Sequence, residues 1–561
     1  MDPDETTIGA ALKETAQNQP KAPLLRYLDS GYTQNWGDFD AASDAIAKGL
    51  LVLGYRGGAH IGIWASKRPV WMHTFFGILK SGNIAVTYND GFHKEAFASQ
   101  LMRSDTEVLF FTEGTPEIDF VSVLNAAVSA PAESKPGEIH DAAFPKLRLA
   151  VFMGNGACPK DFLPMEELIA AGEGISEEDY LSYINALDPE SPAVLQYSTG
   201  TTGTPKGIVH SHKALLGATA IYALACFRET PEAVFHHVLP MHHNTGIITL
   251  LAAIPTGGSG VLREYASTAQ MWEDAKAGGI TCAYYVPTIL TRFLQLAEAE
   301  GINTDGQHPE ESKKTNPLKL RICGVGADKC SPEILFRFVN TFCTKIIHTY
   351  ALTENLLTTV LELNYPLSAP PAEGSIGRTI PGVQCRITDP ASGAVLPDGE
   401  VGEIEMRGFT LMQEYYNNPI ETDKAIGAGG WMKTGDLGVR NPDRSFTFKG
   451  RMKDLIIRGG ENIAPLEIEA VLTGHPAVTE AAVAGKADAV LGEVPVAFLT
   501  VSAPVSQEEL RTYCIRHLPK SLVPTVFRIL EFLPRNTMGK VDKKVLREMA
   551  AAEAEKDSAA V

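Results

Sequence analysis

The sequence lacks the cysteine and histidine patterns that build disulfide frameworks and zinc sites. Its 561 residues include eight cysteines, which lie scattered along the chain without a Cys-x-x-Cys pair, and its histidines show no zinc-finger spacing. Isolated cysteines in a long chain are typical of reduced core thiols. We therefore expect a cytoplasmic protein with free thiols and no structural metal.

Positive charge and long apolar runs are also scarce. Lys and Arg total 49 against 67 Asp and Glu, so the formal net charge is −18. A global attraction for nucleic acid is excluded by this balance, and a polyanionic ligand must meet local donors. The most apolar span, residues 246–262, is interrupted by Pro255 and three glycines, and Met1 leads into acidic, polar sequence. We expect neither export nor an integral membrane segment.

Alternating helical and strand-like patterns predict an α/β fold with more than one domain, because the chain exceeds what one hydrophobic core supports. We expect a large layered α/β body over residues 1–450, with an antiparallel β subdomain from about 374, and a small, mobile α+β domain over 451–561. Expected strands of the body include 60–64, 193–197, 283–286, 321–323 and 345–348, and one expected helix covers 39–53. The small domain should contain helices over 465–472 and 507–517 and strands over 480–485 and 495–501.

The loop between Tyr197 and Gly207 combines glycines, hydroxyl side chains and a lysine. Glycines let backbone N–H groups approach a polyphosphate, threonine hydroxyls donate hydrogen bonds to it, and a lysine offsets its charge. The loop is not a Walker A motif, because Pro205 and Lys206 precede Gly207 where Gly-Lys-Ser/Thr is required. An ordinary surface turn is the alternative. The predicted ATP contacts in this loop are Ser198, Thr199, Gly200, Thr201, Thr202, Gly203, Thr204 and Lys206.

Further motifs accompany this loop in a fixed order. They cover residues 350–354 (Tyr-Ala-Leu-Thr-Glu), 434–436 (Thr-Gly-Asp), 451–454 together with 459–462, and 536–540 (Asn-Thr-Met-Gly-Lys). In order and spacing the set resembles the motif series of the adenylate-forming superfamily, which includes acyl- and aryl-CoA synthetases, nonribosomal adenylation domains and firefly luciferase. The resemblance covers nearly the whole chain.

The resemblance implies a site for ATP and Mg²⁺. Glu354 would hold Mg²⁺ among the phosphate oxygens, since this ion prefers oxygen ligands and takes few of them from protein. Asp436 and Arg451 would contact the ribose, although a structural role in a turn is the alternative for Asp436. The other implied ATP contacts are Gly326, Ala327, Asp328, His348, Thr349, Tyr350 and Thr353.

The small domain would supply the catalytic Lys540. In the resembled family this lysine enters the site for the first half-reaction only, and Lys206 and Mg²⁺ share the stabilisation of charge on the transferred group. Lys453 resembles the hinge about which the small domain swings. A solvated surface lysine and a passive linker are the respective alternatives. After the swing, a passage for the thiol of coenzyme A would be lined by Gly459, Gly460 and Glu461.

His243 aligns with the residue beside the reacting carboxylate in CoA ligases, although a satisfied core histidine is the alternative. Asn244 stands where amino-acid-activating domains usually carry an aspartate, which argues against an amino acid substrate. The residues implied to line the acyl pocket are a mixture of apolar and small polar residues. A hydrophobic or aromatic acid, or a short acid with one polar group, would fit such a pocket. The acyl pocket implied by the resemblance comprises His243, Asn244, Thr245, Gly246, Tyr285, Val325, Gly326 and Asn355.

We therefore expect an ATP-dependent acid–thiol ligase that forms acyl-CoA through an acyl-adenylate, with Lys540, Glu354, Lys206 and His243 as catalytic residues. No protein nucleophile is needed, because the adenylate is itself the activated intermediate. Two alternatives stay open, a stand-alone adenylating enzyme that loads a carrier protein and a nucleotide-binding regulator without turnover. A homodimer is an open expectation for its assembly.

Overall fold

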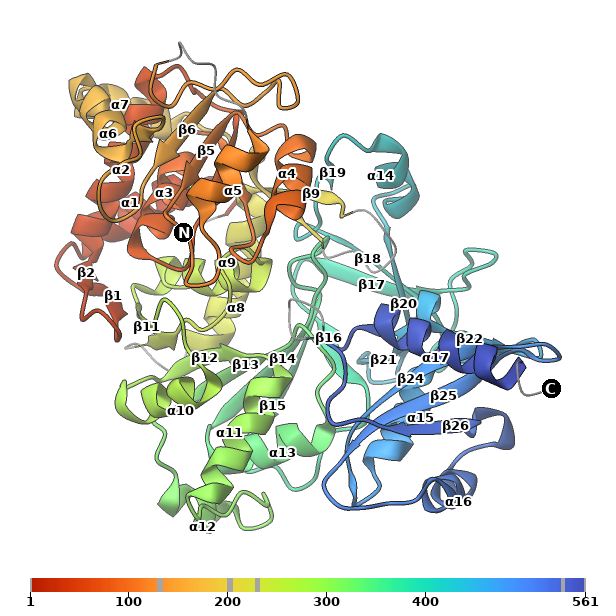
Figure 1. The fold of residues 1–561 in the computed structure, drawn as a ribbon. Coiled ribbons are helices and arrows are strands. Elements are labelled where there is room, and N and C mark those ends of the chain that lie inside the picture. The colour runs from red at the N-terminus through yellow and green to blue at the C-terminus, as the bar shows by residue number, and fades with distance from the viewer. Residues whose placement is uncertain (1–2, 129–134, 199–204, 228–232, 536–539, 559–561) are drawn as a thin grey trace.

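Two large β-sheets form the body of the protein in the computed structural model, which describes residues 3–128, 135–198, 205–227, 233–535 and 540–558 (Figure 1). Over these residues the first sheet has eight strands, and β8, β4, β3, β5 and β6 are parallel neighbours. In sheet order the strands are β19 (Glu414–Tyr415), β9 (Gly207–Ser211), β8 (Pro192–Tyr197), β4 (Ile84–Thr87), β3 (His60–Trp64), β5 (Val108–Phe111), β6 (Leu149–Phe152) and β7 (Leu163–Pro164).

The second sheet has 13 strands over the same described residues, and it changes from parallel to antiparallel pairing at β14. The predicted antiparallel region is confirmed, and its strands continue the large sheet through β15 and β16. In sheet order the strands are β17 (Val383–Thr388), β18 (Gly402–Gly408), β20 (Met432–Arg440), β21 (Phe446–Arg451), β16 (Ser375–Thr379), β15 (Thr359–Asn364), β14 (Lys345–Tyr350), β13 (Ile322–Val325), β12 (Cys282–Tyr285), β10 (Val234–His236), β11 (Ser259–Leu262), β1 (Pro23–Tyr27) and β2 (Thr33–Asn35).

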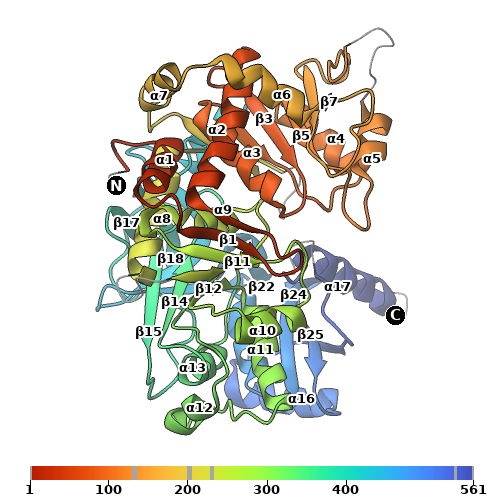
Figure 2. The ribbon, with the colours of Figure 1, turned by 90° about the vertical axis from the view of Figure 1, so that its left-hand side faces the viewer.

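Helices cover both faces of the sheets and create separate hydrophobic cores. One core lies between the two sheets and includes α1 (Ile8–Asn18), α2 (Trp36–Val52), α3 (Pro69–Lys80), α8 (His212–Phe227) and α9 (Asn244–Leu251). A second core joins the first sheet to α4 (Lys94–Arg103) and α5 (Phe120–Ala127). A third joins the second sheet to α10 (Thr268–Ala277), α11 (Pro287–Ala299) and α13 (Pro332–Thr341), which Figure 2 shows below α2 and α3. Shorter helices are α6 (Met165–Ala171), α7 (Glu177–Asn185), α12 (Pro309–Thr315) and α14 (Pro419–Ala425). In the part of the chain that the structure describes, none of the helices has the length and apolarity needed to cross a bilayer.

The C-terminal part has its own sheet and lies against the β14–β21 side of the body (Figure 1). The predicted helices and strands are present, and the helix predicted over 507–517 has those bounds. Helices α15 and α16 pack on one core of this sheet, and α17 packs on the other. The elements are β22 (Ile456–Arg458), β23 (Glu461–Ile463), α15 (Pro465–Thr473), β24 (Val478–Asp488), β25 (Gly492–Val501), α16 (Gln507–His517), β26 (Val526–Ile529) and α17 (Lys543–Ser558).

A buried ionic network ties α1, α2, α3 and α7 together. The side chain of Lys80 is fully buried, and its ammonium pairs with Asp40 and lies 2.6 Å from Asp44. Lys13 also reaches Asp44, at 2.6 Å, and the Tyr180 hydroxyl donates to the same carboxylate. Burial raises the pKa of Asp44, but the ammonium groups of Lys80 and Lys13 outweigh this and hold its pKa below the usual value. The network therefore fixes the helices that support the first sheet.

Lys80→Met should destabilise the protein strongly, by about 3–5 kcal/mol, because it leaves two buried carboxylates without their central cation. Urea unfolding at neutral pH measures the loss. Lys48→Met is the matched control, since Lys48 pairs with the exposed Glu177 and its pair should be worth about 1 kcal/mol or less. Equal losses in the two variants would contradict the role of the buried network.

The pH dependence of unfolding tests the same network. Because the folded-state pKa of Asp44 is lowered, its contribution is present above the unfolded value of about 3.9 and is lost as the pH falls through the folded value. The free energy of unfolding of the wild-type protein should therefore fall on acidification, and Lys80→Met should lessen this fall.

Candidate active site

The predicted site residues lie where strands of both sheets end. Ser198 follows β8 of the first sheet, and its backbone N–H donates to the carbonyl of Lys206 at 3.0 Å, which closes the base of the phosphate-type loop. Asp328 follows β13, and Glu354 follows β14, both in the second sheet. Ligands of open α/β sheets bind beyond the carboxyl ends of such strands. The other predicted loop residues lie outside the described residues: Thr199, Gly200, Thr201, Thr202, Gly203 and Thr204.

One end of the site presents a buried carboxylate. Asp436 on β20 is 3 % exposed, accepts a hydrogen bond from the Tyr350 hydroxyl at 2.7 Å, and lies 3.4 Å from Arg451 on the paired strand β21. Burial raises the pKa of Asp436, while the charge of Arg451 opposes the shift. A carboxylate only accepts hydrogen bonds, so this end can bind a ligand with hydroxyl groups. His348, two residues before Tyr350, is buried, which lowers its pKa to about 4 and leaves the ring neutral at pH 7.

The other end of the predicted set, around Tyr415 of β19, combines an acid and a lysine. The Tyr415 hydroxyl donates to Glu354 at 2.8 Å, and the Lys206 ammonium lies 4.5 Å from the centre of the Tyr415 ring. Lys206 also pairs with Glu421 at 2.7 Å. Thr353 is fixed through its carbonyl, which bonds to a ring nitrogen of the buried His210. This end can therefore bind an anionic ligand, for which Glu421 would release the lysine.

A metal ion at this end would need ligand atoms from a substrate. Among the described residues, no three or more His, Cys, Asp or Glu side chains are grouped so that they could hold one. Glu354 alone offers one carboxylate, which fits Mg²⁺ because this ion keeps most of its ligands from water and phosphate oxygens.

Lys540 brings the C-terminal domain into the site. Its half-buried ammonium is attracted by Asp328 and repelled by Arg451, and burial lowers its pKa. His243 lies close enough that burial and the charge of Lys540 together lower the pKa of His243 to about 4. The charge of Lys540 in the C-terminal part therefore acts on the neutral imidazole of His243 in the body. The neighbouring motif residues 536–539 lie outside the described residues.

His243 and Asn244 lie at the start of helix α9. His243 occupies the N-cap position without a side-chain capping bond, and Asn244 donates from its side-chain amide to the carbonyl of Leu352 at 3.2 Å. The Asn244 oxygen accepts from the backbone N–H of Thr245. A Cβ at Gly246 would lie 2.1 Å from the carbonyl oxygen of Pro240, so only glycine fits. The helix start is therefore held against the loop that follows β14.

Gly326 and Ala327 form a tight turn after β13. A Cβ at Gly326 would lie 2.1 Å from the hydroxyl oxygen of Tyr284 and 2.5 Å from that of Thr349. Ala327 has a φ of 70°, in the left-handed region that non-glycine residues seldom adopt. The turn thereby presents backbone at the site entrance, beside the exposed Asp328.

Three residues predicted for the acyl pocket, Tyr285, Val325 and Asn355, have side chains buried in packed cores, so their place in a pocket stays a prediction. Tyr285 and Val325 lie on the outer face of the second sheet, in the core with α11, and the Tyr285 hydroxyl bonds to His236. Asn355 is fully buried, contacts the Met406 sulfur and accepts from the Thr410 hydroxyl. Residues alternate between faces along a strand, so the neighbour Tyr284 is the tyrosine that faces the site. Because the two tyrosines are adjacent in the sequence, the sequence alone does not show which of them faces the site.

The predicted hinge and passage residues lie at the edge of the C-terminal domain. Lys453 follows β21, where burial lowers its pKa, and its carbonyl accepts from Arg547 of α17. Gly459 and Gly460 form the turn between β22 and β23, with φ values of 58° and 88°. Both glycines and the adjoining Glu461 are exposed.

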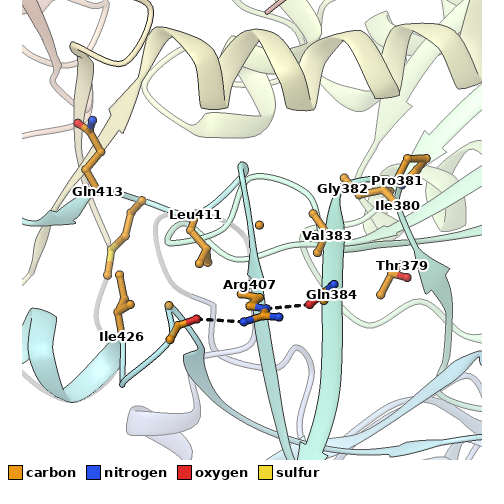
Figure 3. Close-up of a pocket in the computed structure, with 14 residues that line it drawn as sticks. Thr379, Ile380, Pro381, Gly382, Val383, Gln384, Arg407, Leu411, Gln413 and Ile426 are labelled. Atoms are coloured by element: carbon orange, nitrogen blue, oxygen red, sulfur yellow. Dashed lines mark hydrogen bonds between the residues drawn. The ribbon is translucent and has the colours of Figure 1, made fainter. Parts of the chain in front are cut away.

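A groove of about 940 Å³ lies elsewhere, between the β16–β17 turn and the segment around β19. Figure 3 shows Arg407 within it, with its guanidinium bonded to the side chain of Gln384 at 2.7 Å and to the carbonyl of Gly429 at 3.3 Å. None of the predicted site residues lines this groove. The groove is therefore separate from the predicted site residues.

Comparisons with known proteins agree over nearly the whole chain. The family model of AMP-binding enzymes matches residues 12–416, and the model of their C-terminal domain matches 467–540. The chain is 30% identical over 552 residues to a sulfoacetate–CoA ligase of Cupriavidus necator, with 96% of each chain covered. It is 25% identical to a mitochondrial medium-chain acyl-CoA ligase of Danio rerio, with 97% of this chain and 88% of the relative covered. The solved structure of o-succinylbenzoate CoA synthetase from Bacillus subtilis with its acyl-adenylate has a TM-score of 0.74 and 25% identity, covering 96% of this chain and 97% of that one.

Gly326→Ala should lower the thermal midpoint and weaken the binding of AMP. The added methyl group would overlap the hydroxyls of Tyr284 and Thr349, and such overpacking costs about 1–3 kcal/mol. Calorimetric unfolding and AMP titration measure the two effects. Gly174→Ala is the control, since nothing lies within 4 Å of its added Cβ. An unchanged midpoint in Gly326→Ala would show that the turn yields without cost.

Proposed function

Because the chain belongs to the family of AMP-binding enzymes, we propose that it is an AMP-forming carboxylate–CoA ligase. In the proposed reaction a carboxylate attacks the α-phosphorus of ATP, forming an acyl-adenylate and releasing pyrophosphate. The thiol of coenzyme A then displaces AMP to give acyl-CoA. The observation that supports the proposal is that the charge of Lys540, in the C-terminal part, interacts electrostatically with His243 and Asp328 of the body, because a protein that only binds nucleotide needs no lysine from a second domain.

The proposed ATP site extends between the two ends described above. Asp436 and Arg451 would bind the ribose, and the adenine would lie between the 326–328 turn and the end of β14. Lys206 would leave Glu421 for the phosphates. Glu354 would hold the Mg²⁺ that shields phosphate charge when bound. In each case a neighbouring residue already holds the donor or acceptor in place. The ligand would either displace that neighbour or bind beside it.

Lys540 and His243 have complementary roles in the first half-reaction. The attack joins two anions, and a positioned ammonium lowers the barrier by stabilising the charge that builds on the α-phosphate. His243 stays neutral at pH 7, because its pKa is lowered to about 4. It can therefore lie against the substrate carboxylate without competing with Lys540 as a cation.

The second half-reaction would use a different domain arrangement. Rotation about Lys453 would withdraw Lys540 and bring the turn of Gly459 and Gly460 to the site, where its backbone would line the path of the thiol. The present exposure of this turn fits the adenylate-forming arrangement. A cytoplasmic location is part of the proposal, as are coenzyme A as the acceptor and a small carboxylic acid as the substrate.

A carrier protein as acceptor is the remaining alternative within the same chemistry, and acyl-CoA detected by mass spectrometry would decide for coenzyme A. A regulator without turnover is the alternative outside it. Pyrophosphate release that depends on an added carboxylate would exclude that alternative.

Lys540→Ala should slow adenylate formation about 10²–10³-fold, which is the usual loss when one transition-state donor is removed. The conversion of supplied acyl-adenylate and coenzyme A should be almost unchanged. Pyrophosphate release and acyl-CoA formation measure the two steps. Lys544→Ala, four residues on and exposed, is the control and should leave both steps unchanged. Equal loss of both steps in Lys540→Ala would contradict the alternation of domains.

Gly460→Leu should give the opposite pattern, with adenylate formation kept and thiol transfer slowed at least about tenfold, because a side chain would obstruct the proposed passage. Nothing lies within 4 Å of a Cβ at this position in the present arrangement. Gly393→Leu is the matched control for backbone strain, since Gly393 has a similar φ of 72° and equally open surroundings. A slowed first step in Gly460→Leu alone would assign the turn to adenylation instead.

A further inference from the structure

We propose that Tyr284 and Tyr222 close the inner end of the acyl pocket, so that the enzyme accepts short carboxylic acids and excludes long-chain and aromatic ones. This inference rests on the proposed function and names its substrate class. Neither tyrosine was among the predicted site residues. Both rings lie in the core between the two sheets, on the inner face of the second sheet and next to the turn at Gly326.

Tyr284 reaches the level of this turn and is held there. Its hydroxyl lies 2.6 Å from the Thr349 hydroxyl, which also bonds to the carbonyl of Val325. The Tyr284 oxygen stands 2.1 Å from where a Cβ of Gly326 would be. With 6 % of its surface exposed, Tyr284 is enclosed on nearly all sides. Its hydroxyl therefore forms the floor beneath the site entrance.

Tyr222 of α8 fills the space next to Tyr284. The ring centroids lie 5.8 Å apart at an interplanar angle of 59°, and Tyr222 is 3 % exposed. A Cβ at Gly324 would lie 2.5 Å from a ring carbon of Tyr284 and 2.6 Å from the hydroxyl oxygen of Tyr222. Since not even a methyl group fits between β13 and the two rings, an alkyl chain cannot run along this strand.

Helix α9 closes the adjoining side. Its backbone at Gly246 packs directly on Pro240, and Ile247 and Leu250 are buried in the same core as both tyrosines. An acyl chain that enters beside His243 is thus limited by α9, by β13 and by the tyrosine pair. A longer chain would have to break the bond between Tyr284 and Thr349 and separate two packed rings. A short acid needs neither change.

The first test measures binding to the wild-type protein and needs no turnover. Acetyl-, octanoyl- and benzoyl-sulfamoyladenosine, stable mimics of acyl-adenylates, are titrated by calorimetry. We expect the acetyl compound to bind at least about a hundredfold more tightly than the other two, since a pocket that lacks space discriminates steeply. Tighter binding of the octanoyl or benzoyl compound would overturn the inference and leave the proposed ligase intact.

The second test enlarges the pocket. Tyr284→Ala and Tyr222→Ala should each strengthen octanoyl-sulfamoyladenosine binding about tenfold or more, and Tyr284→Val serves as the milder change should a variant fold poorly. Acetate, propionate, octanoate and benzoate are then compared as substrates. In the same variants kcat/KM for octanoate should rise by a similar factor.

Tyr285→Ala is the matched control, because it removes the same side chain from the adjacent residue on the opposite face of β12. It should lower stability without admitting octanoate. If all three Ala variants behave alike, loosened packing explains the result and the inference fails. Absence of pyrophosphate release with every acid would count against the proposed function, while the binding series would still decide the inference.

Discussion

In the proposed mechanism, the cost of burying the charge of Lys540 is the constraint on how the two domains would sit together. An ammonium loses hydration when it is buried, and here Asp328 is the anion that attracts it while Arg451 opposes it. In the proposed reaction, ATP and the carboxylate add the negative charge that this arrangement lacks. Departure of pyrophosphate removes most of that charge. The same electrostatics would therefore favour closure before the first step and release of the domain before the second.

The antiparallel strands of the second sheet connect the surroundings of the Lys540 ammonium to the predicted hinge at Lys453. Its strands β20 and β21 pair Asp436 with Arg451, and the chain reaches Lys453 two residues later. In the proposed mechanism, a ligand held by Asp436 would thus contact the segment about which the small domain rotates. These strands belong to the antiparallel region predicted from about residue 374, and they share one sheet with β14. Their continuity with β14 also keeps Asp436 in fixed relation to Tyr350 and Glu354.

Local patterns predicted the elements well, whereas pairings between distant segments could not be read from the sequence. The helix over 507–517 and the strand over 60–64 have the predicted bounds, because their apolar periodicity is complete within one segment. The resemblance brought Lys540, His243 and Asp436 to one region of the structure. It also assigned Tyr285, Val325 and Asn355 to the acyl pocket, and their side chains lie buried in packed cores. Glu421 and Tyr222 carry no motif, and only packing between distant helices and strands places them.

The residues proposed for the chemistry and the residues proposed for substrate selectivity therefore lie in different parts of the fold. The groups proposed to bind ATP lie on loops after strands or, like Asp436 and Arg451, on paired strands, and their positions suit phosphate and ribose chemistry. The proposed floor of the acyl pocket lies on β12 and α8, inside a packed core. There the size of one aromatic ring determines how long an acyl group fits. The names of the relatives range from sulfoacetate to medium-chain acids, so membership of the family leaves the acid open. In this proposal the acid that the chain accepts depends on Tyr284 and Tyr222, because their rings occupy the volume that a longer acyl group would need.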